Sequence, residues 1–480
     1  MSMWLANTSL MRPSIPDWLE DLCQRLTDND PTLTTLEVSH QRIDDTSVKY
    51  LSKALNENRT VTILIISLFN VVDDGSFALG QVLTANRYIK KLQFRDLHHS
   101  REVITMFDAV GRNDTIEEFS LRHCRICSRS AESLGLLVRR QRSIKELRLV
   151  DSVILGDNLH PLAEGLVSNR TLERLFLVNC EIGPKEARFL GSRVAQSTTL
   201  KELHLSENNL GDDGVLKLCS GIQRNSSLTT LDLRSNNIGS KGALAIETLI
   251  VRHRSLTHLY VGCNRLGCAG VSSLASGLAQ NSNILVLDLS DNGIEASGAE
   301  ALARTLSFNP KLQELNLSFN FLGDQGATAI SSVLETNHIL LRLGLRRNHI
   351  SNLGATAIAQ LLPTMRGLRE LVLTKNLIDC DGAALLLAGL RTNMELEYLH
   401  IEDSDLSQPI LSELAHWIGL NQAGRRIFRE TNLDVGLWAR VLAKVNNEPN
   451  VLFHFLTEKP EFLQQNRSSG ICVVNDLSRF

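Results

Sequence analysis

Two hydrophobic patterns alternate along the chain from residue 33 to about residue 406. The stretch LDLRSNNIGSKGALAIETLIVRHRS, residues 231–255, contains both of them. Leu231–Asp232–Leu233 alternates as a half-buried strand does, and Ala243, Ile246, Leu249 and Ile250 follow at helical spacing. An apolar residue with two more at three and five positions later recurs through fourteen such units. Repeats of this length predict a solenoid.

The first apolar position of each unit fixes the register of the repeats. Successive units are 28 residues apart, with one step of 27. These first positions are Leu33, Val61, Ile89, Ile116, Ile144, Leu172, Leu200, Leu228, Leu256, Ile284, Leu312, Leu340, Leu368 and Leu396.

An Asn follows the predicted strand in the later units, eight residues after the first apolar position. The amide side chain has two donor hydrogens and an acceptor, so it can bond backbone groups that lose partners where the chain turns inward. Cys124 and Cys180 occupy the same slot in earlier units, whereas Gln41, Phe69 and Leu97 occupy it in the first three. We therefore predict a stacked ladder made of Asn208, Asn236, Asn264, Asn292, Asn320, Asn348 and Asn376.

The units follow the pattern L-x-x-L-x-L-x-x-N/C-x-L, and the chain resembles the leucine-rich repeat family, in particular its ribonuclease-inhibitor-like class. LDLRSNNIGSKGALAIETL, LDLSDNGIEASGAEALARTL and LNLSFNFLGDQGATAISSVL carry the resemblance. It implies an α/β leucine-rich repeat solenoid. Because helices pack about 8–10 Å apart and strands only about 4.8 Å, we expect a horseshoe with parallel strands inside and helices outside.

Two further residue types recur in the helical half of the unit. A Gly precedes small residues where the chain enters the helix, as at Gly242 and Gly298. An Asn closes most units three residues before the next one begins, as at Asn58, Asn113, Asn169 and Asn225. Since Asn tolerates the left-handed conformation, we expect it to end the helix in that conformation. The four N-x-S/T sequons at these Asn residues are then a product of the repeat and not glycosylation signals.

Residues outside the repeats are expected to cover the ends of the array. We predict an N-terminal helical cap at residues 1–32, the solenoid at 33–406, a C-terminal helical cap at 407–464 and a disordered tail at 465–480. Trp417, Trp438, Phe453, Phe455 and Phe462 are expected to form the core of the second cap.

Composition narrows the class of protein further. Aromatic residues make up only 5% of the chain, so the core must be aliphatic, and a net charge of −3 favours neither nucleic acid nor an anionic membrane. Nine scattered cysteines, no secretory signal and no apolar run of spanning length predict a reduced protein of the cytoplasm or nucleus.

Motifs for catalysis are missing from the sequence. It has no G-x-x-x-x-G-K-[ST] phosphate loop, so the nucleotide-binding NACHT module of NOD-like receptors is absent. No G-x-S-x-G elbow, kinase signature set or H-E-x-x-H zinc motif is present, and the cysteines do not form a zinc-binding set. We interpret His123, Cys124 and His204 as structural or solvated. The sequence predicts a chain that is not an enzyme and needs neither cofactor nor metal.

What remains as a binding surface is the concave side of the strands. A partner-binding patch is predicted where an apolar centre is surrounded by cations, an arrangement typical of interaction hot spots. Its residues are Lys91, Arg95, Arg122, Arg148, Val150, Arg174, Phe176 and Val178. A second candidate patch, with Glu402 and Asp403 nearby as opposing charges, consists of Arg342, Arg346, Arg347 and Lys375.

Three classes of function compete. The first is a non-catalytic scaffold or regulator that binds a protein, with an acidic or phosphorylated surface as its partner. The alternative is a GTPase activator similar to the Ran GTPase-activating proteins, acting on a small GTPase, although the chain ends in RSSGICVVNDLSRF and not in their acidic tail. The third is an immune-type sensor without its effector domain. A ribonuclease inhibitor is disfavoured, because that family is much richer in Cys.

Overall fold

The computed structural model describes residues 16–38, 43–71, 73–97, 100–154, 156–281, 283–401 and 406–425, together with residues 454 and 457. The chain divides into two compact units, Met1–Leu259 and Tyr260–Phe480. Each unit is described separately below.

The first unit alternates strands with helices. Its strands are β1 (Thr35–Val38), β2 (Ile63–Ser67), β3 (Lys91–Arg95), β4 (Glu118–Arg122), β5 (Glu146–Val150), β6 (Arg174–Val178), β7 (Glu202–His204) and β8 (Thr230–Asp232). Its helices are α1 (Asp17–Thr27), α2 (Asp45–Glu57), α3 (Asp73–Ala85), α4 (Ser100–Arg112), α5 (Ser128–Arg140), the 3-10 turn η1 (Gly156–Asn158), α6 (Leu159–Ser168), α7 (Pro184–Val194), α8 (Gly211–Ile222) and α9 (Ser240–Arg252).

The second unit repeats the same alternation, and β9 (His258–Tyr260) lies at the boundary. Its strands are β10 (Val286–Asp288), β11 (Glu314–Asn316), β12 (Arg342–Gly344), β13 (Glu370–Val372) and β14 (Tyr398–His400). Its helices are α10 (Gly267–Gln280), α11 (Ala296–Leu306), α12 (Gly323–Leu334), α13 (Asn352–Leu361), α14 (Cys380–Leu390) and α15 (Gln408–Gln422).

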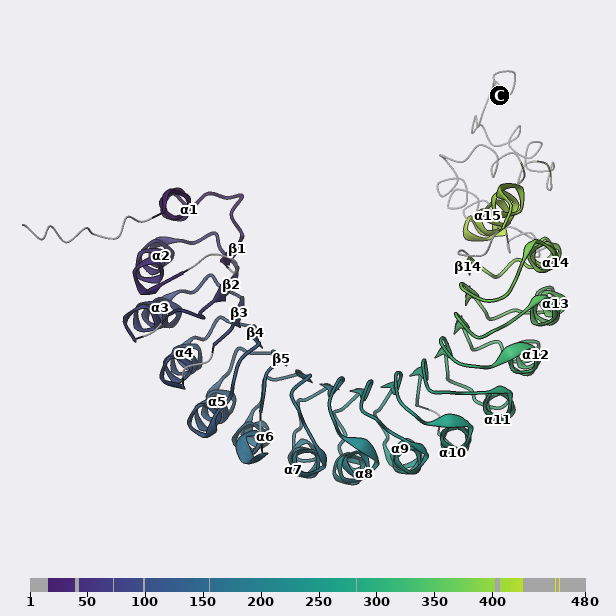
Figure 1. Cartoon of the computed structure of the whole chain (residues 1–480), viewed down its shortest axis with the longest axis horizontal. Coiled ribbons are helices and arrows are strands. Elements are labelled where there is room, and N and C mark those ends of the chain that lie inside the picture. The colour runs from purple at the N-terminus through teal and green to yellow at the C-terminus, as the bar shows by residue number, and fades with distance from the viewer. Residues whose placement is uncertain are drawn as a thin grey trace, which may run out of the picture. The chain divides into compact units, whose positions relative to one another are not determined.

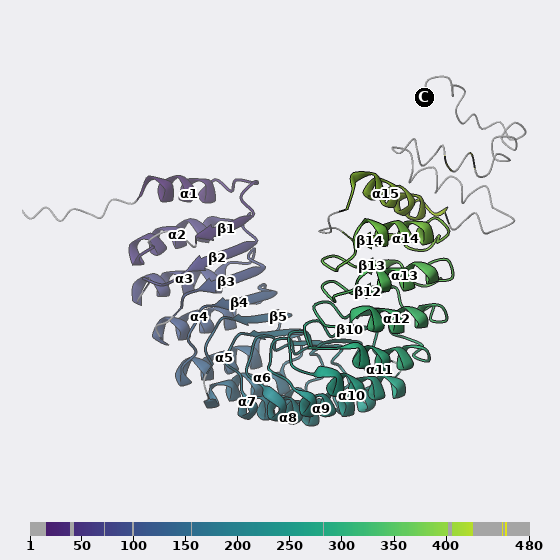
Figure 2. The same ribbon diagram turned by 45° about the vertical axis from the view of Figure 1, so that its right-hand side comes forward.

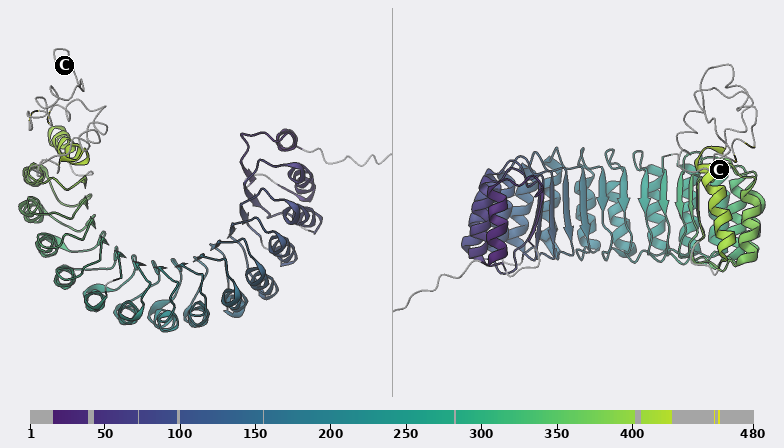
Figure 3. Two further views of the ribbon diagram at one scale, coloured as in Figure 1. Left: turned by 180° about the vertical axis from the view of Figure 1, so that it is seen from behind. Right: turned by 90° about the horizontal axis from the view of Figure 1, so that it is seen from above.

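Strands pair in parallel and in chain order, from β1 to β8 in the first unit and from β10 to β14 in the second. Within each unit, the strands line one side and the helices form a single layer on the other (Figures 1, 2 and 3). The predicted α/β leucine-rich repeat solenoid, with repeats of about 28 residues, is confirmed. We call the sheet side that faces away from the helices the inner face.

The core lies between the strands and the helices and is aliphatic, as the composition predicts. In the unit that begins at Leu228, the side chains of Leu228, Leu231 and Leu233 are completely buried. Ala243 and Ile246 of α9 are buried against them. Each such leucine contributes roughly 1.5–3 kcal/mol by its removal from water, and its neighbours in the next unit continue the same layer.

The slot eight residues into the unit is filled by amides that bond two units at once. The Nδ2 group of Asn208 donates to the carbonyls of Leu177, Leu205 and Ser206 at 2.7–3.1 Å. Its Oδ1 accepts from the backbone N–H groups of Cys180 and Ile182 at 2.9 and 3.0 Å. The amide thus satisfies backbone groups of its own turn and of the preceding one.

Strand length changes where this Asn first appears. Strands β2 to β6 have five residues, whereas β7 to β14 have three, and Asn208 follows β7. In the earlier units the slot holds Cys124, Ser152 and Cys180, and the Ser152 hydroxyl donates to the carbonyl of Val150 at 2.9 Å. Leu97 is buried in this slot, but Phe69 is exposed, and Gln41 lies outside the described residues.

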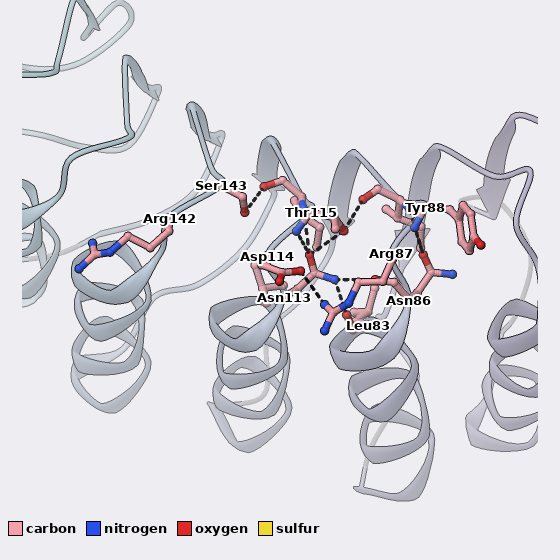
Figure 4. Close-up of polar contacts among 12 residues, drawn as sticks. Leu83, Asn86, Arg87, Tyr88, Asn113, Asp114, Thr115, Arg142 and Ser143 are labelled. Atoms are coloured by element: carbon pink, nitrogen blue, oxygen red, sulfur yellow. Dashed lines mark hydrogen bonds and ion pairs between the residues drawn. The ribbon is translucent and has the colours of Figure 1, made fainter.

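The closing Asn residues form a second ladder, and the left-handed conformation expected for them is wrong. Asn58 and Asn169 have φ values of −76° and −69° with extended ψ. The Nδ2 group of Asn113 donates to the carbonyls of Leu83 and Asn86 at 2.7 and 2.8 Å, across to the preceding unit (Figure 4). Its Oδ1 accepts from the N–H groups of Thr115 and Ile116.

Because they serve this ladder, the four Asn residues of the N-x-S/T sequons are only 2–4% exposed. A glycan could not be attached to these side chains in the folded chain. The sequons are a consequence of the repeat.

Left-handed backbone occurs instead in the turn after each strand. The residue before the ladder slot has a positive φ in each unit from Asp96 to Lys375. This turn aims the next side chain into the core and leaves its own at the surface.

The recurrent Gly lies in the first turn of the helix and allows the preceding unit to cap it. The carboxylate of Asp212 accepts from the N–H groups of Gly239 and Gly242 at 2.6 and 2.9 Å, at the start of α9. A Cβ atom on Gly242 would lie 2.7 Å from that carboxylate oxygen, so only Gly leaves room for this cap.

Helices α1 and α15 lie beside the first and last repeats. Leu19, Cys23 and Leu26 of α1 are buried, and the Nδ2 group of Asn421 in α15 continues the closing ladder by donating to the carbonyls of Asn393 and Leu396. The predicted remainder of the second cap and the predicted disordered tail lie outside the described residues, apart from residues 454 and 457.

Candidate protein-binding surface

Strands β3 to β6 bring the residues of the first predicted patch together on the inner face. Arg148 is the register partner of Phe176, and Val150 is that of Val178. Arg95 and Arg122 are likewise partners on β3 and β4. The side chains that alternate with them, such as Leu147 and Leu149, are buried in the core, as the period of two requires.

A buried carboxylate organises the centre of this patch. Glu146, only 5% exposed, accepts a hydrogen bond from Arg148 and another at 2.6 Å from the Nε of Arg174. Burial alone would raise the pKa of Glu146, but these two bonds outweigh it and lower the pKa. The two arginines are therefore ion-paired and held in place.

The ring of Phe176 lies between two flat, nitrogen-containing groups. The guanidinium carbon of Arg148 is 3.7 Å from the ring centroid. On the other side, the imidazole of His204 stacks at 4.1 Å with an interplanar angle of 8°. We call Glu146, Arg148, Arg174, Phe176 and His204 the Phe176 cluster. Its contacts produce a rigid aromatic surface on the inner face.

His204 is fixed from the next strand. Its Nδ1 lies 3.4 Å from the carboxylate of Asp232, and its Nε2 lies 3.3 Å from that of Glu202. Burial alone would raise the pKa of Asp232, but hydrogen bonds with His204 and Arg234 outweigh it and hold the pKa at about 2. Asp232 therefore stays ionised and orients the imidazole against Phe176.

The remaining cations of the first patch are also paired. Lys91 lies 2.9 Å from Glu118, Arg95 lies 3.0 Å from Glu37, and Arg122 lies 3.3 Å from Asp151. The Lys and Arg residues that the sequence places around Phe176 thus alternate with carboxylates, and the patch is close to neutral. The carboxylates lie one unit away in the sequence for Lys91 and Arg122 and two units away for Arg95, and only the stacking of the strands brings them next to the cations.

A shallow hollow of about 170 Å³ adjoins the cluster on the inner face. Ile63 and Ile65 of β2, Gln93 of β3, and Glu146 and Arg148 of β5 contribute to its walls. The hollow provides a place where a side chain of a partner could enter beside Arg148.

A larger groove lies at the loops that connect helices to strands in the first unit. It has a volume of about 630 Å³ and is lined by Arg142, Arg170 and a row of hydroxyl side chains that includes Thr115 and Ser143. Figure 4 places Arg142, Ser143 and Thr115 on successive loops of this edge. The guanidinium groups of Arg142 and Arg170 donate to backbone carbonyls at their own helix ends. These bonds give the two arginines a structural role, and we do not choose the groove as the binding surface.

The arginines of the second predicted patch have two kinds of neighbour, carboxylates at Arg342 and an aromatic ring at Arg346 and Arg347. Arg342 forms ion pairs with Glu314 and Glu370 at 2.8 and 3.2 Å. Arg346 and Arg347, in contrast, each have their guanidinium carbon 5.4 Å from the ring centroid of Phe319. Lys375 occupies the same turn one unit after Arg347. The predicted opposing charges, Glu402 and Asp403, lie outside the described residues.

The described part of the chain contains no group of three or more His, Cys, Asp or Glu side chains arranged to hold a metal ion. Cys124 and Cys127 have C-x-x-C spacing but different surroundings. Burial raises the pKa of the Cys124 thiol to about 12, whereas a hydrogen bond from Ser130 lowers that of Cys127. A buried neutral thiol at position 124 is a poor nucleophile. None of the described helices has the length and apolarity needed to cross a bilayer.

Comparison with known families agrees with this architecture. A model described as "Leucine Rich repeat" matches six segments, at residues 196–219, 224–246, 252–275, 280–303, 308–331 and 336–359. No curated protein sequence matches the chain. The matched segments coincide with six successive strand–helix repeats of the structure, so residues 196–359 consist of leucine-rich repeats.

Proposed function

We propose that this protein is a non-catalytic scaffold or regulator that binds a protein partner on the inner face of its first unit, at the Phe176 cluster. Leucine-rich repeat domains generally serve as protein-interaction scaffolds, and the repeats offer a broad surface instead of a deep pocket. The observation that carries the proposal is the fixed position of Phe176 between Arg148 and His204.

Pre-organisation is the physical reason to expect binding there. An aromatic ring and two arginines that are already held in one geometry lose little conformational freedom when a partner covers them. Aromatic and Arg side chains also dominate the energetics of protein interfaces. The hollow beside Arg148 adds a site for one anchoring side chain.

The pairing of the arginines with carboxylates changes the kind of partner that we expect at the Phe176 cluster. Since Glu146 compensates Arg148 and Arg174, strong attraction to an acidic or phosphorylated surface is not expected at this cluster. A partner with mixed charge and an exposed apolar or aromatic residue fits better. GTPase activation remains the alternative, and it requires the partner to be a small GTPase.

The test compares two variants that remove the same kind of ring. Phe189 of α7 stacks on His160 at 3.7 Å and lies 4.8 Å from the guanidinium of Arg193, so it repeats the Arg–Phe–His arrangement in the helical layer. Partners captured by the unmodified chain from a cell extract should be lost with Phe176→Ala and retained with Phe189→Ala. Captured GTPases are then assayed for faster GTP hydrolysis.

Equal retention by both variants would exclude the inner face around Phe176 as the binding surface. Loss with Phe189→Ala alone would assign binding to the helical layer.

A further inference from the structure

We propose that the second unit carries a separate docking surface for an acidic polypeptide segment with a large apolar side chain. The surface lies in the loops that follow β11, β12 and β13. We call it the Phe319 edge and define it as Phe319, Phe321, Arg346, Arg347 and Leu377. It goes beyond the function proposed above, because it shares no residue with the Phe176 cluster and binds a different kind of ligand.

The first observation is the conformation of Phe319. It has a φ of 61°, in the left-handed region that bulky side chains rarely adopt. The same turn position has a positive φ in the other units as well, where it holds residues as different as Asp96, Arg347 and Lys375, so the conformation belongs to the repeat. In this unit the turn keeps a phenylalanine 41% exposed. An exposed aromatic ring that the core does not need points to a role at the surface.

The second observation is that two cations here have no counter-charge among the described residues. Among the residues that the structure describes, Arg346 and Arg347 form no ion pair, and both approach the Phe319 ring. The Nε atom of Arg346 is buried and has no hydrogen-bond partner within the described part of the chain. A carboxylate provides the planar pair of acceptors that a guanidinium group binds best.

The third observation is that two large apolar side chains are exposed in the loops after β11 and β13. Phe321 is 59% exposed and Leu377 is 63% exposed, and the ring of Phe321 stacks on His349 with centroids 5.4 Å apart. The backbone fixes both positions, since Phe321 N–H donates to the carbonyl of Ile294 at 2.8 Å and Leu377 N–H donates to that of Ile350 at 2.7 Å. Large apolar side chains left exposed in neighbouring loops are typical of an interaction site.

These three observations define one occupant. Carboxylates of an Asp- or Glu-rich segment would pair with Arg346 and Arg347, and a neighbouring aromatic or aliphatic side chain would cover Phe319 and Phe321. A basic segment is repelled by the arginines, and a purely apolar one leaves them unpaired when it desolvates them. Charge complementarity therefore selects an acidic segment of another protein.

A random peptide-display library provides the test, because it does not require the partner to be identified first. Selection on the full chain should enrich peptides in which Asp or Glu flanks a Trp, Phe or Leu. Their affinity should fall as salt rises, because exposed charges are screened. Phe319→Asn removes the ring but keeps a residue that tolerates positive φ, and it should weaken binding at least about tenfold. The double variant Arg346→Gln, Arg347→Gln should do the same.

The matched control is Phe176→Ala, which should leave the selected peptides bound as tightly as before. This control also separates the two proposals, since Phe176→Ala is the change expected to abolish binding at the inner face. Failure to enrich any peptide, enrichment of basic peptides, or equal binding by the unmodified chain and Phe319→Asn would overturn the proposal. Circular dichroism of each variant establishes that loss of binding is not loss of fold.

Discussion

Two clusters of arginine around a phenylalanine, one in each unit, differ in what surrounds the cations. In the Phe176 cluster, Glu146 is buried and accepts hydrogen bonds from Arg148 and Arg174. At the Phe319 edge, the described residues offer Arg346 and Arg347 no carboxylate. The same residue types therefore form a nearly neutral, rigid surface in one place and, among the described residues, a cationic surface without carboxylates in the other.

This difference teaches that counting arginines on a repeat face does not give its charge. In a parallel stack, the residue that neutralises a cation can lie at the paired register position of the neighbouring strand, 28 residues away along the chain. Arg174 and Glu146 are such a pair on β6 and β5. Charge on these surfaces is a property of neighbouring units and is best assessed across strands.

The largest predicted effect tests whether the difference in ion pairing between the two clusters is local, or whether the second unit is less stable as a whole. Asn208 and Asn320 make equivalent sets of five side-chain hydrogen bonds, one in each unit. Replacement of either by Leu leaves buried backbone groups without partners and should cost about 3 kcal/mol. The exposed Asn209→Leu change serves as the control and should cost almost nothing.

Chemical denaturation of the three variants measures these costs. A markedly smaller loss for Asn320→Leu than for Asn208→Leu would mean that the second unit is looser as a whole. The difference between the clusters would then not be a matter of local ion pairing.

The two Asn ladders show which features of the fold could be predicted from the sequence and which could not. The period and the alternation at Leu231–Asp232–Leu233 were enough to predict the solenoid, since burying one strand face and one helix face determines each unit. The closing Asn residues were misjudged, because a side-chain amide such as that of Asn113 can reach the preceding unit, and that contact is not visible in one repeat alone.

The candidate sites were less predictable for the same reason. The sequence indicated Phe176 and the cations, but the role of Glu146 depends on burial and on two arginines from different strands. Nothing in the sequence of a single unit indicates that Arg346 and Arg347 of the next unit approach the ring of Phe319. Contacts between units decide both sites.

The second prediction breaks the ion pairs on one side of the comparison. Glu146→Gln keeps the shape of the side chain but removes the charge that Arg148 and Arg174 share. Hydrogen bonds to charged groups contribute about 1.5–3 kcal/mol each, so the variant should lose about 2 kcal/mol of unfolding free energy. Glu117→Gln, at the exposed pair with Lys145, is the matched control and should lose less than about 1 kcal/mol. Coincident denaturation curves for the two variants would mean that Glu146 does not organise the cluster.

The third prediction concerns the pH dependence of stability in the first unit, which we expect to come from His253 and not from the carboxylates of the Phe176 cluster. His253 replaces the closing Asn, its Nδ1 accepts from Leu256 N–H at 3.2 Å, and its Nε2 is buried without a partner among the described residues. Burial lowers the pKa of His253 from 6.5 to about 4. The unfolded chain therefore binds the proton first as pH falls, and stability present above pH 6.5 is lost progressively towards pH 4.

From pH 7 to pH 5 this loss amounts to about 2 kcal/mol. His253→Asn should remove it and raise stability, because an amide restores the ladder donor. Asp232 does not contribute in that range, since its pKa is about 2. Unfolding measured at both pH values, with the exposed His338→Asn as control, tests this assignment. An unchanged pH dependence in His253→Asn would contradict it.

The smallest change in stability is expected when one arginine of each cluster is replaced. Arg148→Gln leaves the buried Glu146 with one cation fewer and removes the contact with Phe176, so it should cost about 1–2 kcal/mol. Arg346→Gln removes a guanidinium that has no carboxylate among the described residues and whose Nε is buried without a partner, so stability should change by less than about 0.5 kcal/mol. Thermal unfolding of both variants in one buffer makes the comparison directly. If Arg346→Gln were as destabilising as Arg148→Gln, Arg346 would be a structural residue, and its contact with Phe319 would no longer indicate a surface kept available for a partner.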